Sequence, residues 1–445
     1  MSGPEELQRE ATWKFDRVTQ LAIQQGRVNQ ELQELAGFTS IEQAEGGTAV
    51  TRVVFTKDDL RARAWLKEIA TADGFTVRED AVGNTFLRWE GLEPELPAVA
   101  TGSHIDAIPH SGRYDGTVGV IGGLEAMRVL KHSGARFRRS IEVVMLTSEE
   151  PTRFGIGCLG SRLISGTLAP ERADQLTDGL EEQSTGTLAS VRETAGFHGD
   201  LASVRLERGH YHAWLELHIE QGPLLEREGL SIGIVTGIAA PAGYRIVIEG
   251  FGGHAGALLM PDRRDALCAA AEVILSIERH ALAANAASHS ATPDTVATVG
   301  TCAVFPGAVN SVPSRVKLEV DIRDTDPARR EAAMQGVRRD CAEIAARRGV
   351  TITEELVNAD APALCDARLV VTLNAICAEL GVTAKQMVSR AYHDSLFMAQ
   401  VTPVAMIFIP CRGGVSHRPD EYASPEDIAL GTQVLAHALA RLAAE

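Results

Sequence analysis

The stretch that decides the fold is residues 101–116, TGSHIDAIPHSGRYDG, which directly follows the apolar run 96–100. The run has the composition of a buried strand, so His104 and Asp106 are expected at its carboxyl end. Side chains alternate along an extended chain, which places these two residues on one face. The glycine and serine residues that follow let the chain turn back, so that Asp115 can reach the same point. The pattern predicts a metal site in which one residue is a ligand, another orients it, and Asp115 bridges two cations.

Helices and apolar strands alternate on both sides of this stretch. Helical spacing over residues 5–36 and 56–72 precedes strand patterns at 76–80 and 84–89, and a helix at 118–132 precedes a buried strand at 140–146. This alternation predicts an α/β fold, in which a mixed sheet is flanked by helices and carries its ligands at strand ends.

Two adjacent carboxylates, Glu149 and Glu150, follow the strand expected at 140–146. Side chains of neighbouring residues point in different directions, so one carboxylate can bind a metal while the other acts as a general base. The alternative interpretation is a solvated acidic turn. The buried strand before the pair and the glycine-rich GIGCLGS after it favour the functional interpretation.

Two further histidines lie in or just after apolar strands. His218 lies in WLELHIEQGP, where it shares one strand face with Glu216 and Glu220, and His417 follows the apolar run 403–410. A histidine alone on a strand is more often structural. These two are candidates because the other ligand-type residues also lie at strand ends.

The pattern changes near residue 232. Strands are expected at 234–238, 244–249, 296–304 and 315–321, and helices at 263–284 and 327–348. We interpret residues 232–349 as an inserted α+β satellite domain that serves as a lid or dimerisation domain. Residues 1–231 and 350–445 then form the catalytic domain, and the strand at 351–357 is expected to return the chain to it.

The satellite segment contains three polar residues that can reach a ligand. His254 lies between glycines in a tight loop, Asn310 lies on a turn, and Arg323 presents a planar fork that suits a carboxylate. Surface solvation for Arg323 and backbone capping for Asn310 are the alternatives. The polar loop 389–395, which includes His393, follows later in the chain.

Composition restricts the class of protein. The chain has 445 residues, which favours two domains, and its net charge of -16 argues against nucleic acid or an anionic membrane surface as a partner. We find no apolar run of the roughly 18 to 20 residues that a membrane span needs and no secretory signal pattern. The seven cysteines include no CxxC pair. We therefore expect a cytoplasmic protein with reduced cysteines.

Five residues form the candidate metal centre: His104, Asp115, Glu150, His218 and His417. Three imidazoles and two carboxylates suit Mn²⁺, Zn²⁺, Co²⁺ or Ni²⁺ better than Ca²⁺. If Asp115 bridges, two cations lie roughly 3.5 to 4 Å apart and lower the pKa of a shared water towards about 7. Glu149 can remove its proton and return it to a leaving amine. This predicts metal-assisted hydrolysis of an amide-like bond; the alternative, a non-catalytic metal-binding protein, is disfavoured because Glu149 is present with all five ligands.

The order HxD, D, EE, HIEQGP and SHxPxE resembles the M20-type metal-dependent amidases of the hydantoinase/carbamoylase branch, over nearly the whole chain. The resemblance implies that His104, Asp115 and His218 hold one metal and that Asp115, Glu150 and His417 hold the other. It implies that Glu149 is the general base and that Asp106 supports His104. It further implies that the substrate is contacted by Gln221, His254, Asn310 and Arg323, with His254 supplied by the satellite domain of the partner in a homodimer.

Within this family, RAYHDSLFMA, MIFIPCRGG and SEEPTRFGIGCLGSR are similar to the ureidoglycolate amidohydrolases of plants. This implies a manganese-dependent conversion of ureidoglycolate to glyoxylate, ammonia and carbon dioxide, a step of purine catabolism. Tyr392, next to His393, replaces a glycine of the more common GxGHD pattern and would narrow the pocket for a small substrate. An N-carbamoyl-L-amino-acid hydrolase or an allantoate amidohydrolase, with the same metals and base, is the nearest alternative.

Overall fold

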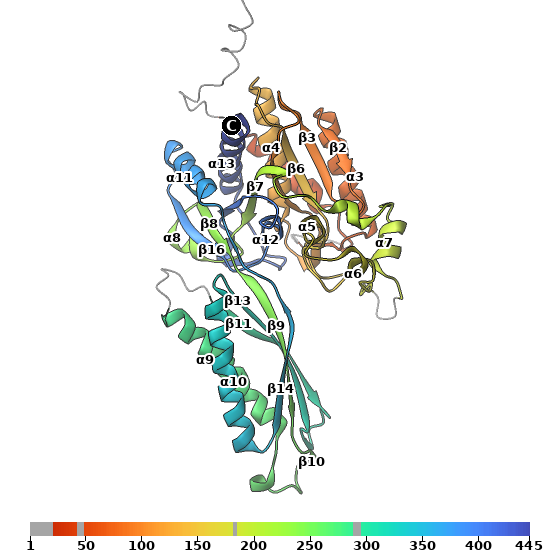
Figure 1. The fold of residues 1–445 in the computed structure, drawn as a ribbon, viewed down its shortest axis with the longest axis vertical. Helices are drawn as coiled ribbons and strands as arrows, with labels where there is room; N and C mark the ends of the chain where they lie inside the picture. The colour runs from red at the N-terminus through yellow and green to blue at the C-terminus, as the bar shows by residue number, and fades with distance from the viewer. Residues whose placement is uncertain (1–20, 42–48, 181–184, 288–294) are drawn as a thin grey trace, which may run out of the picture. The chain divides into compact units, whose positions relative to one another are not determined.

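The structure is a computed structural model that describes residues 21–41, 49–180, 185–287 and 295–445 (Figure 1). These residues form two compact units. The first comprises the described residues up to Thr236 with Cys365–Met387 and His393–Glu445, and the second comprises Gly237–Leu364 with Val388–Tyr392. The helical prediction for residues 5–20 lies outside the described residues. Among the described helices, none is long and apolar enough to cross a membrane.

The first unit is built on a mixed sheet of nine strands. Along the sheet the strands lie in the order β15 (Ala363–Leu364), β8 (Ile232–Ile238), β17 (Val404–Ile409), β7 (Tyr211–Ile219), β4 (Ala98–His104), β6 (Ile141–Leu146), β3 (Thr85–Trp89) and β2 (Thr76–Glu79), and β16 (Ala384–Ser389) pairs with β8. The four central strands, from β17 to β6, are parallel, and β8, β3 and β2 are antiparallel to their neighbours. The predicted mixed sheet with flanking helices is therefore confirmed.

Helices cover both faces of this sheet. One core contains side chains from α2 (Gln25–Ala36), α3 (Lys57–Ala72), α4 (Thr117–His132), α11 (Ala367–Glu379) and α13 (Pro425–Ala444), and the other contains side chains from α5 (Leu159–Ser165), α6 (Pro170–Asp174), α7 (Leu188–Thr194) and α12 (Asp394–Met398). Strand β6 is buried along its whole length, because Val143 faces the first core and Val144 the second. A parallel strand covered on both faces therefore reads as a continuous apolar run.

The main helices begin at residues that can cap them. The side chain of Thr56 accepts a hydrogen bond from the backbone N–H of Asp59 at the start of α3, and Ser424 does the same for Asp427 in α13. A cap of this kind is worth about 1 kcal/mol. Shorter elements complete the unit: β1 (Val50–Arg52), β5 (Ala107–Ser111), α8 (Leu224–Glu228), η1 (Leu201–Val204) and η3 (Arg412–Gly414).

The second unit is a four-stranded antiparallel sheet with two long helices on it. Its strand order is β11 (Val296–Phe305), β13 (Arg315–Asp324), β9 (Ala240–Glu249) and β14 (Thr351–Ala359), and α9 (Ala266–Ala287) lies beside α10 (Pro327–Arg348) (Figure 1). Alternate residues of β13, from Val316 to Ile322, are buried under these helices. The short strands β10 (Gly253–His254) and β12 (Ser311–Val312) pair with each other, and η2 (Met260–Asp262) follows β10.

The boundaries of the second unit differ from the predicted insertion at 232–349. Strand β8 pairs with β17 in the sheet of the first unit, and β14 pairs with β9 in the satellite sheet instead of returning the chain. The chain re-enters the first unit at Cys365. The prediction missed this because β14 is exposed along nearly its whole length, so its residues carry no burial pattern that would assign them to a core.

Candidate metal centre

The predicted ligands meet at one edge of the first unit's sheet. Strands β4, β6, β7 and β17 are parallel, so their carboxyl ends lie at the same edge. His104 is the last residue of β4 and His218 is the penultimate residue of β7. Glu150 follows β6, His417 follows β17, and Asp115 precedes α4. Topology therefore gathers residues that are more than 300 positions apart in the sequence.

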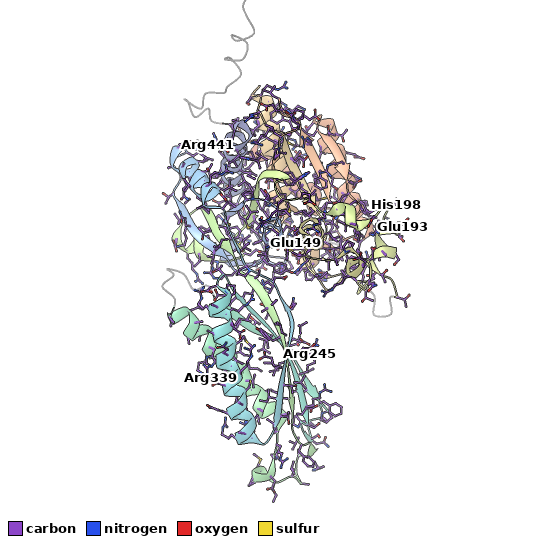
Figure 2. The ribbon with its side chains drawn as sticks, viewed as in Figure 1. Glu149, Glu193, His198, Arg245, Arg339 and Arg441 are labelled. Atoms are coloured by element: carbon purple, nitrogen blue, oxygen red, sulfur yellow. The ribbon has the colours of Figure 1, made fainter. Side chains whose placement is uncertain are left out.

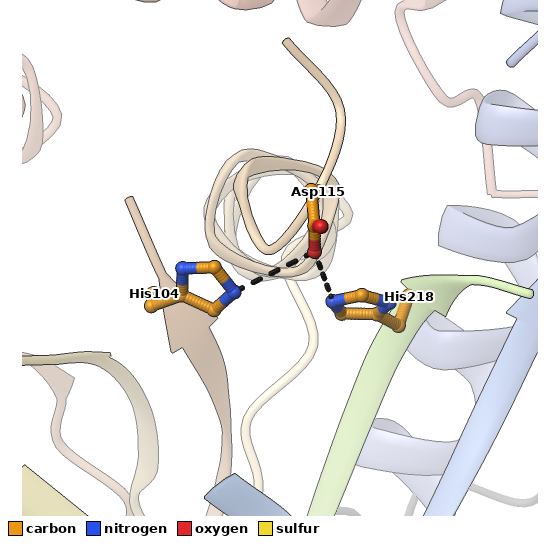
Figure 3. Close-up of side chains that lie close together, drawn as sticks. All are labelled: His104, Asp115 and His218. Atoms are coloured by element: carbon orange, nitrogen blue, oxygen red, sulfur yellow. Dashed lines mark ion pairs between the residues drawn. The ribbon is translucent and has the colours of Figure 1, made fainter. Parts of the chain in front are cut away.

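Asp115 lies between two imidazoles. Its Oδ1 is 3.7 Å from Nε2 of His104 and 3.1 Å from Nε2 of His218, and Figure 3 shows the two rings on either side of this carboxylate. The three side chains are buried, and their ligand atoms lie within 4.8 Å of one another. They form the first ligand group.

The other oxygen of Asp115 faces a second ligand group. Nε2 of His417 is 3.1 Å from Oδ2 of Asp115 and 3.2 Å from Oε1 of Glu150. The ligand atoms of these three residues also lie within 4.8 Å of one another. Asp115 is therefore common to both groups and presents a different oxygen to each.

The separations fit cations. At metal–ligand bonds of about 2.1 Å, two ligand atoms lie about 3.0 Å apart at a right angle and about 3.4 Å apart at a tetrahedral angle. The distances from Asp115 to His218 and to His417, both 3.1 Å, lie in this range, and the distance to His104, 3.7 Å, is somewhat longer. The residues thus fit two divalent cations that share one carboxylate.

In the first ligand group, a hydrogen bond on the far side of each imidazole fixes the orientation of the ring. Nδ1 of His104 lies 3.0 Å from the backbone oxygen of Asp106, and Nδ1 of His218 lies 2.9 Å from the backbone oxygen of Ile219. When Nδ1 donates to a carbonyl, Nε2 is left to face the centre.

Asp106 contacts both His104 and the loop that carries the two glutamates. It contacts His104 through its backbone oxygen, while the nearest approach of its carboxylate to Nδ1 is 3.8 Å. The carboxylate instead accepts hydrogen bonds from the backbone N–H groups of Glu149, at 3.3 Å, and Glu150, at 3.1 Å. Asp106 therefore joins the loop after β4 to the loop after β6.

Glu149 lies beside the first ligand group and inside the unit (Figure 2). Its Oε2 is 3.7 Å from Nε2 of His104, and its Oε1 accepts a hydrogen bond from the thiol of Cys158 at 3.5 Å. Burial raises the pKa of Glu149 well above its usual value, and the negative charge of Glu150 adds to this, although His104 opposes it. In this environment the Glu149 carboxyl takes up a proton more readily than an exposed glutamate does.

Without a cation, the histidines and carboxylates neutralise one another. Burial by itself lowers the pKa of His104, but Glu149 and Asp115 raise it well above the usual value overall. Hydrogen bonds to Asp115 and Glu150 raise the pKa of His417 to about 11. A cation that binds here would therefore replace protons held on these imidazoles.

Gln221 and two residues that the sequence analysis did not single out also contact Asp115. Nε2 of Gln221 donates to Oδ2 of Asp115 at 2.8 Å, and the hydroxyl of Ser416 lies 3.0 Å from the same oxygen. Glu421 accepts hydrogen bonds from the backbone N–H of Asp115 and from Ser416. Ser416 and Glu421 are the first and last residues of the SHxPxE motif, which was the available signal for both.

His393 lies next to the centre, because its ring packs against the ring of His218. The two ring centroids are 4.4 Å apart, and Glu216 completes a buried group whose ligand atoms lie within 4.8 Å of one another. Both oxygens of Glu216 are engaged as hydrogen-bond acceptors, one for Ser103 and the other for Ser395.

The predicted substrate residues of the second unit form two separate pairs. Cζ of Arg323 lies 5.6 Å from the ring centroid of Tyr392, and its guanidinium makes a two-point ion pair with Asp321 at 2.8 and 3.2 Å. The backbone of Asn310 accepts a hydrogen bond from Ala255, next to His254. His254 and Asn310 lie beyond the Arg315 end of β13, which is about 26 Å from its Arg323 end at 3.3 Å per residue.

Comparisons with known proteins place this architecture in a family. The profile of the peptidase family M20/M25/M40 matches residues 100–441. The chain is 49% identical over 427 residues to ureidoglycolate hydrolase from Arabidopsis thaliana, covering 95% of this chain and 87% of that one. It is 37% identical to N-carbamoyl-L-amino acid amidohydrolase from Geobacillus stearothermophilus, covering 95% and 99%.

A solved structure agrees with the sequence comparisons. The crystal structure of AtUAH in complex with glyoxylate is similar with a TM-score of 0.82 and 48% identity, covering 96% of this chain and 99% of that chain. Together with the two ligand groups around Asp115, these matches show that the chain belongs to the peptidase family M20/M25/M40, a family of metal-dependent hydrolases.

Proposed function

We propose that this protein is an amidohydrolase that converts ureidoglycolate to glyoxylate, ammonia and carbon dioxide with two bound divalent cations. The observation that carries the proposal is the shared carboxylate of Asp115, which presents Oδ1 to one ligand group and Oδ2 to the other, with Glu149 beside the first. A paired site of this kind suits hydrolysis of a carbon–nitrogen bond.

In the proposed site, His104, Asp115 and His218 hold one cation and Asp115, Glu150 and His417 hold the other. Imidazole and carboxylate ligands suit Mn²⁺, and Zn²⁺, Co²⁺ and Ni²⁺ are also compatible with them. When bound, the cations polarise the ureido carbonyl and lower the pKa of the attacking water.

The protein's own groups carry the proton. Glu149 accepts it from the attacking water at Oε2, the oxygen that faces the ligand group, while Cys158 holds Oε1. The same carboxyl then donates the proton to the leaving nitrogen, so that ammonia departs rather than an amide anion. Each ureidoglycolate consumes one water and yields one glyoxylate, one carbon dioxide and two ammonia molecules.

In this proposal, residues of the second unit select the substrate by its size and its charge. Arg323 supplies a planar fork for the substrate carboxylate, and its ion pair with Asp321 and the nearby ring of Tyr392 hold that fork in place. In this proposal Tyr392, which replaces a glycine of the GxGHD pattern, disfavours the larger side group of an N-carbamoyl amino acid. The 49% identity to ureidoglycolate hydrolase supports this choice of substrate over a carbamoyl amino acid.

We also propose a homodimer formed through the satellite domain. His254 and Asn310 lie at the opposite end of β13 from Arg323, so these substrate residues of one chain cannot converge within its second unit. In the dimer, His254 of the partner subunit completes the site. A reducing, cytoplasmic location is proposed for the working enzyme, because all seven cysteines are free.

The test is ammonia and glyoxylate release from ureidoglycolate, allantoate and a set of N-carbamoyl-L-amino acids, with metal-stripped protein reloaded with Mn²⁺. We expect ureidoglycolate to be preferred, with two ammonia molecules per glyoxylate. Preference for a carbamoyl amino acid would keep the mechanism but overturn the substrate. Absence of turnover despite bound metal would overturn the proposed activity.

A further inference from the structure

The turn that carries Glu149 begins where a β-ladder stops. Strands β3 and β6 pair antiparallel as far as Thr85 opposite Met145. Continued in register, Gly83 would face Thr147, but Gly83 has a φ of 89° and takes the chain away from the ladder. The backbone of Thr147 therefore leaves the sheet without the strand partner that the register would supply.

Two buried side chains take the place of that partner. Oδ1 of Asn84 accepts a hydrogen bond from the backbone N–H of Thr147 at 2.9 Å. The Nη1 group of Arg63 donates both to the backbone oxygen of Gly83, at 2.8 Å, and to the hydroxyl of Thr147, at 3.3 Å. Asn84 and Arg63 are almost completely buried, so these hydrogen bonds do not compete with water.

Asn84 is itself held rigidly. Its Nδ2 group donates to Oδ2 of Asp80 at 2.8 Å, and its backbone N–H donates to Oδ1 of the same carboxylate at 2.9 Å. A Cβ added at Gly160 would lie only 2.2 Å from Oδ1 of Asn84, which shows how closely the start of α5 packs against it. The amide of Asn84 therefore has one available orientation.

The opposite side of the turn is fixed by the start of α5 and by Cys158, the residue before it. Three consecutive backbone N–H groups, of Cys158, Leu159 and Gly160, donate to the backbone oxygens of Glu149, Ser148 and Thr147 at 2.7 to 2.9 Å. The turn includes Ser148 at a φ of 57°, a conformation that a serine adopts only when its surroundings impose it. Asn84 acts at the first residue of this turn, two positions before Glu149.

We infer that Asn84 is a positioning residue for the general base: it fixes the start of the turn 147–150 and thereby the place of the Glu149 carboxylate. The inference rests on the proposed role of Glu149. A displacement of about 1 Å at a reacting group can lower the rate about 100-fold, so a side chain that removes such freedom has a measurable effect on turnover.

The test is a double-mutant cycle of Asn84→Ala and Glu149→Gln on the full-length, Mn²⁺-loaded protein, with kcat, KM, bound metal and melting temperature measured for each variant. We expect Asn84→Ala to lower kcat about 10- to 100-fold, to change KM less than about threefold and to keep the metal content. In the Glu149→Gln background, the same substitution should lower kcat less than about threefold, because the group that it positions is no longer a base.

Tyr211→Phe is the matched control. It removes a buried hydrogen bond, from the Tyr211 hydroxyl to Glu142 at 2.7 Å, at the other end of the same sheet. This variant should lower the melting temperature without lowering kcat per metal-loaded site. A purely structural role for Asn84 would give the same result as the control, and would overturn the inference.

The remaining outcomes separate the inference from the proposed function. If Glu149→Gln leaves kcat unchanged, the role of Glu149 fails, and the inference fails with it. If Glu149→Gln lowers kcat but Asn84→Ala lowers it by the same factor in both backgrounds, only the inference fails. If Asn84→Ala does not fold, Asp80→Asn replaces it, because this change leaves one acceptor oxygen where Asn84 now uses two. A loss of kcat that occurs only when Glu149 is intact supports the inference, and an unchanged kcat overturns it.

Discussion

Replacing Asp115 should remove both cations, whereas replacing a ligand of one group should remove one. Asp115→Ala deletes Oδ1, which lies 3.1 Å from His218, and Oδ2, which lies 3.1 Å from His417. His417→Ala deletes only the nitrogen that faces Asp115 and Glu150. A lost supporting partner of a ligand costs about 10- to 100-fold in affinity, so loss of a ligand itself should cost at least about 100-fold, or about 2.7 kcal/mol.

The stoichiometry follows from these values. In dialysis against free Mn²⁺ that just saturates the wild-type protein, a weakening of about 100-fold leaves a site almost empty. We expect two ions per chain for the wild type, one for His417→Ala and fewer than one for Asp115→Ala, measured by elemental analysis. Glu193→Ala is the control, because Glu193 is an exposed acid that forms an ion pair with His198, and this variant should keep both ions. Retention of one full ion by Asp115→Ala would refute the shared carboxylate.

Three further predictions concern the base, the pH and the substrate. Glu149→Gln should lower kcat about 10²- to 10⁴-fold while both ions stay bound, and an unchanged rate in the ammonia assay would remove Glu149 from its role. The affinity for Mn²⁺ should rise as the pH rises. The pKa of His417 is raised to about 11 and that of His104 is also raised, so both imidazoles must lose a proton before the cation binds. Calorimetry across neutral pH measures this affinity, and an affinity that does not change with pH would contradict the prediction. Tyr392→Gly should increase kcat/KM for a bulky N-carbamoyl amino acid relative to ureidoglycolate about tenfold, and an unchanged ratio would show that Tyr392 does not limit the size of the substrate.

The meeting of the predicted metal ligands could be foreseen because four of the five, all except Asp115, lie at or just after the end of an apolar run. Such runs are parallel strands buried on both faces, and their carboxyl ends share one edge of the sheet. The sequence therefore indicated that His104, Glu150 and His417 would meet, although more than 260 positions separate the last two. Sequence position could not show that Asp106 uses its backbone for His104 and its carboxylate for the turn after β6.

The extent of the second unit was not predictable in the same way. Strand β14 takes its place by backbone pairing with β9, and its exposed side chains carry no periodic signal. Asn84 was missed for a related reason. The sequence pattern placed it in the strand expected at 84–89, whereas β3 begins at Thr85, and its role depends on the residue that its side chain meets after the β3–β6 ladder ends.

Strained backbone conformations mark the candidate centre in the structure, and the sequence alone did not show them. Four residues other than glycine have a positive φ near the centre: Ser148 at 57°, Cys158 at 56°, Gln221 at 53° and His417 at 58°. This conformation costs about 1 to 2 kcal/mol for such residues, and glycine would avoid the cost. Glycine has no side chain, however, and Gln221 and His417 each contact Asp115 through theirs. The turns at this edge must reverse the chain and also present a functional side chain, so glycine cannot replace these residues. Hydrogen bonds such as that from Thr147 to Asn84 stabilise the strained backbone of these turns.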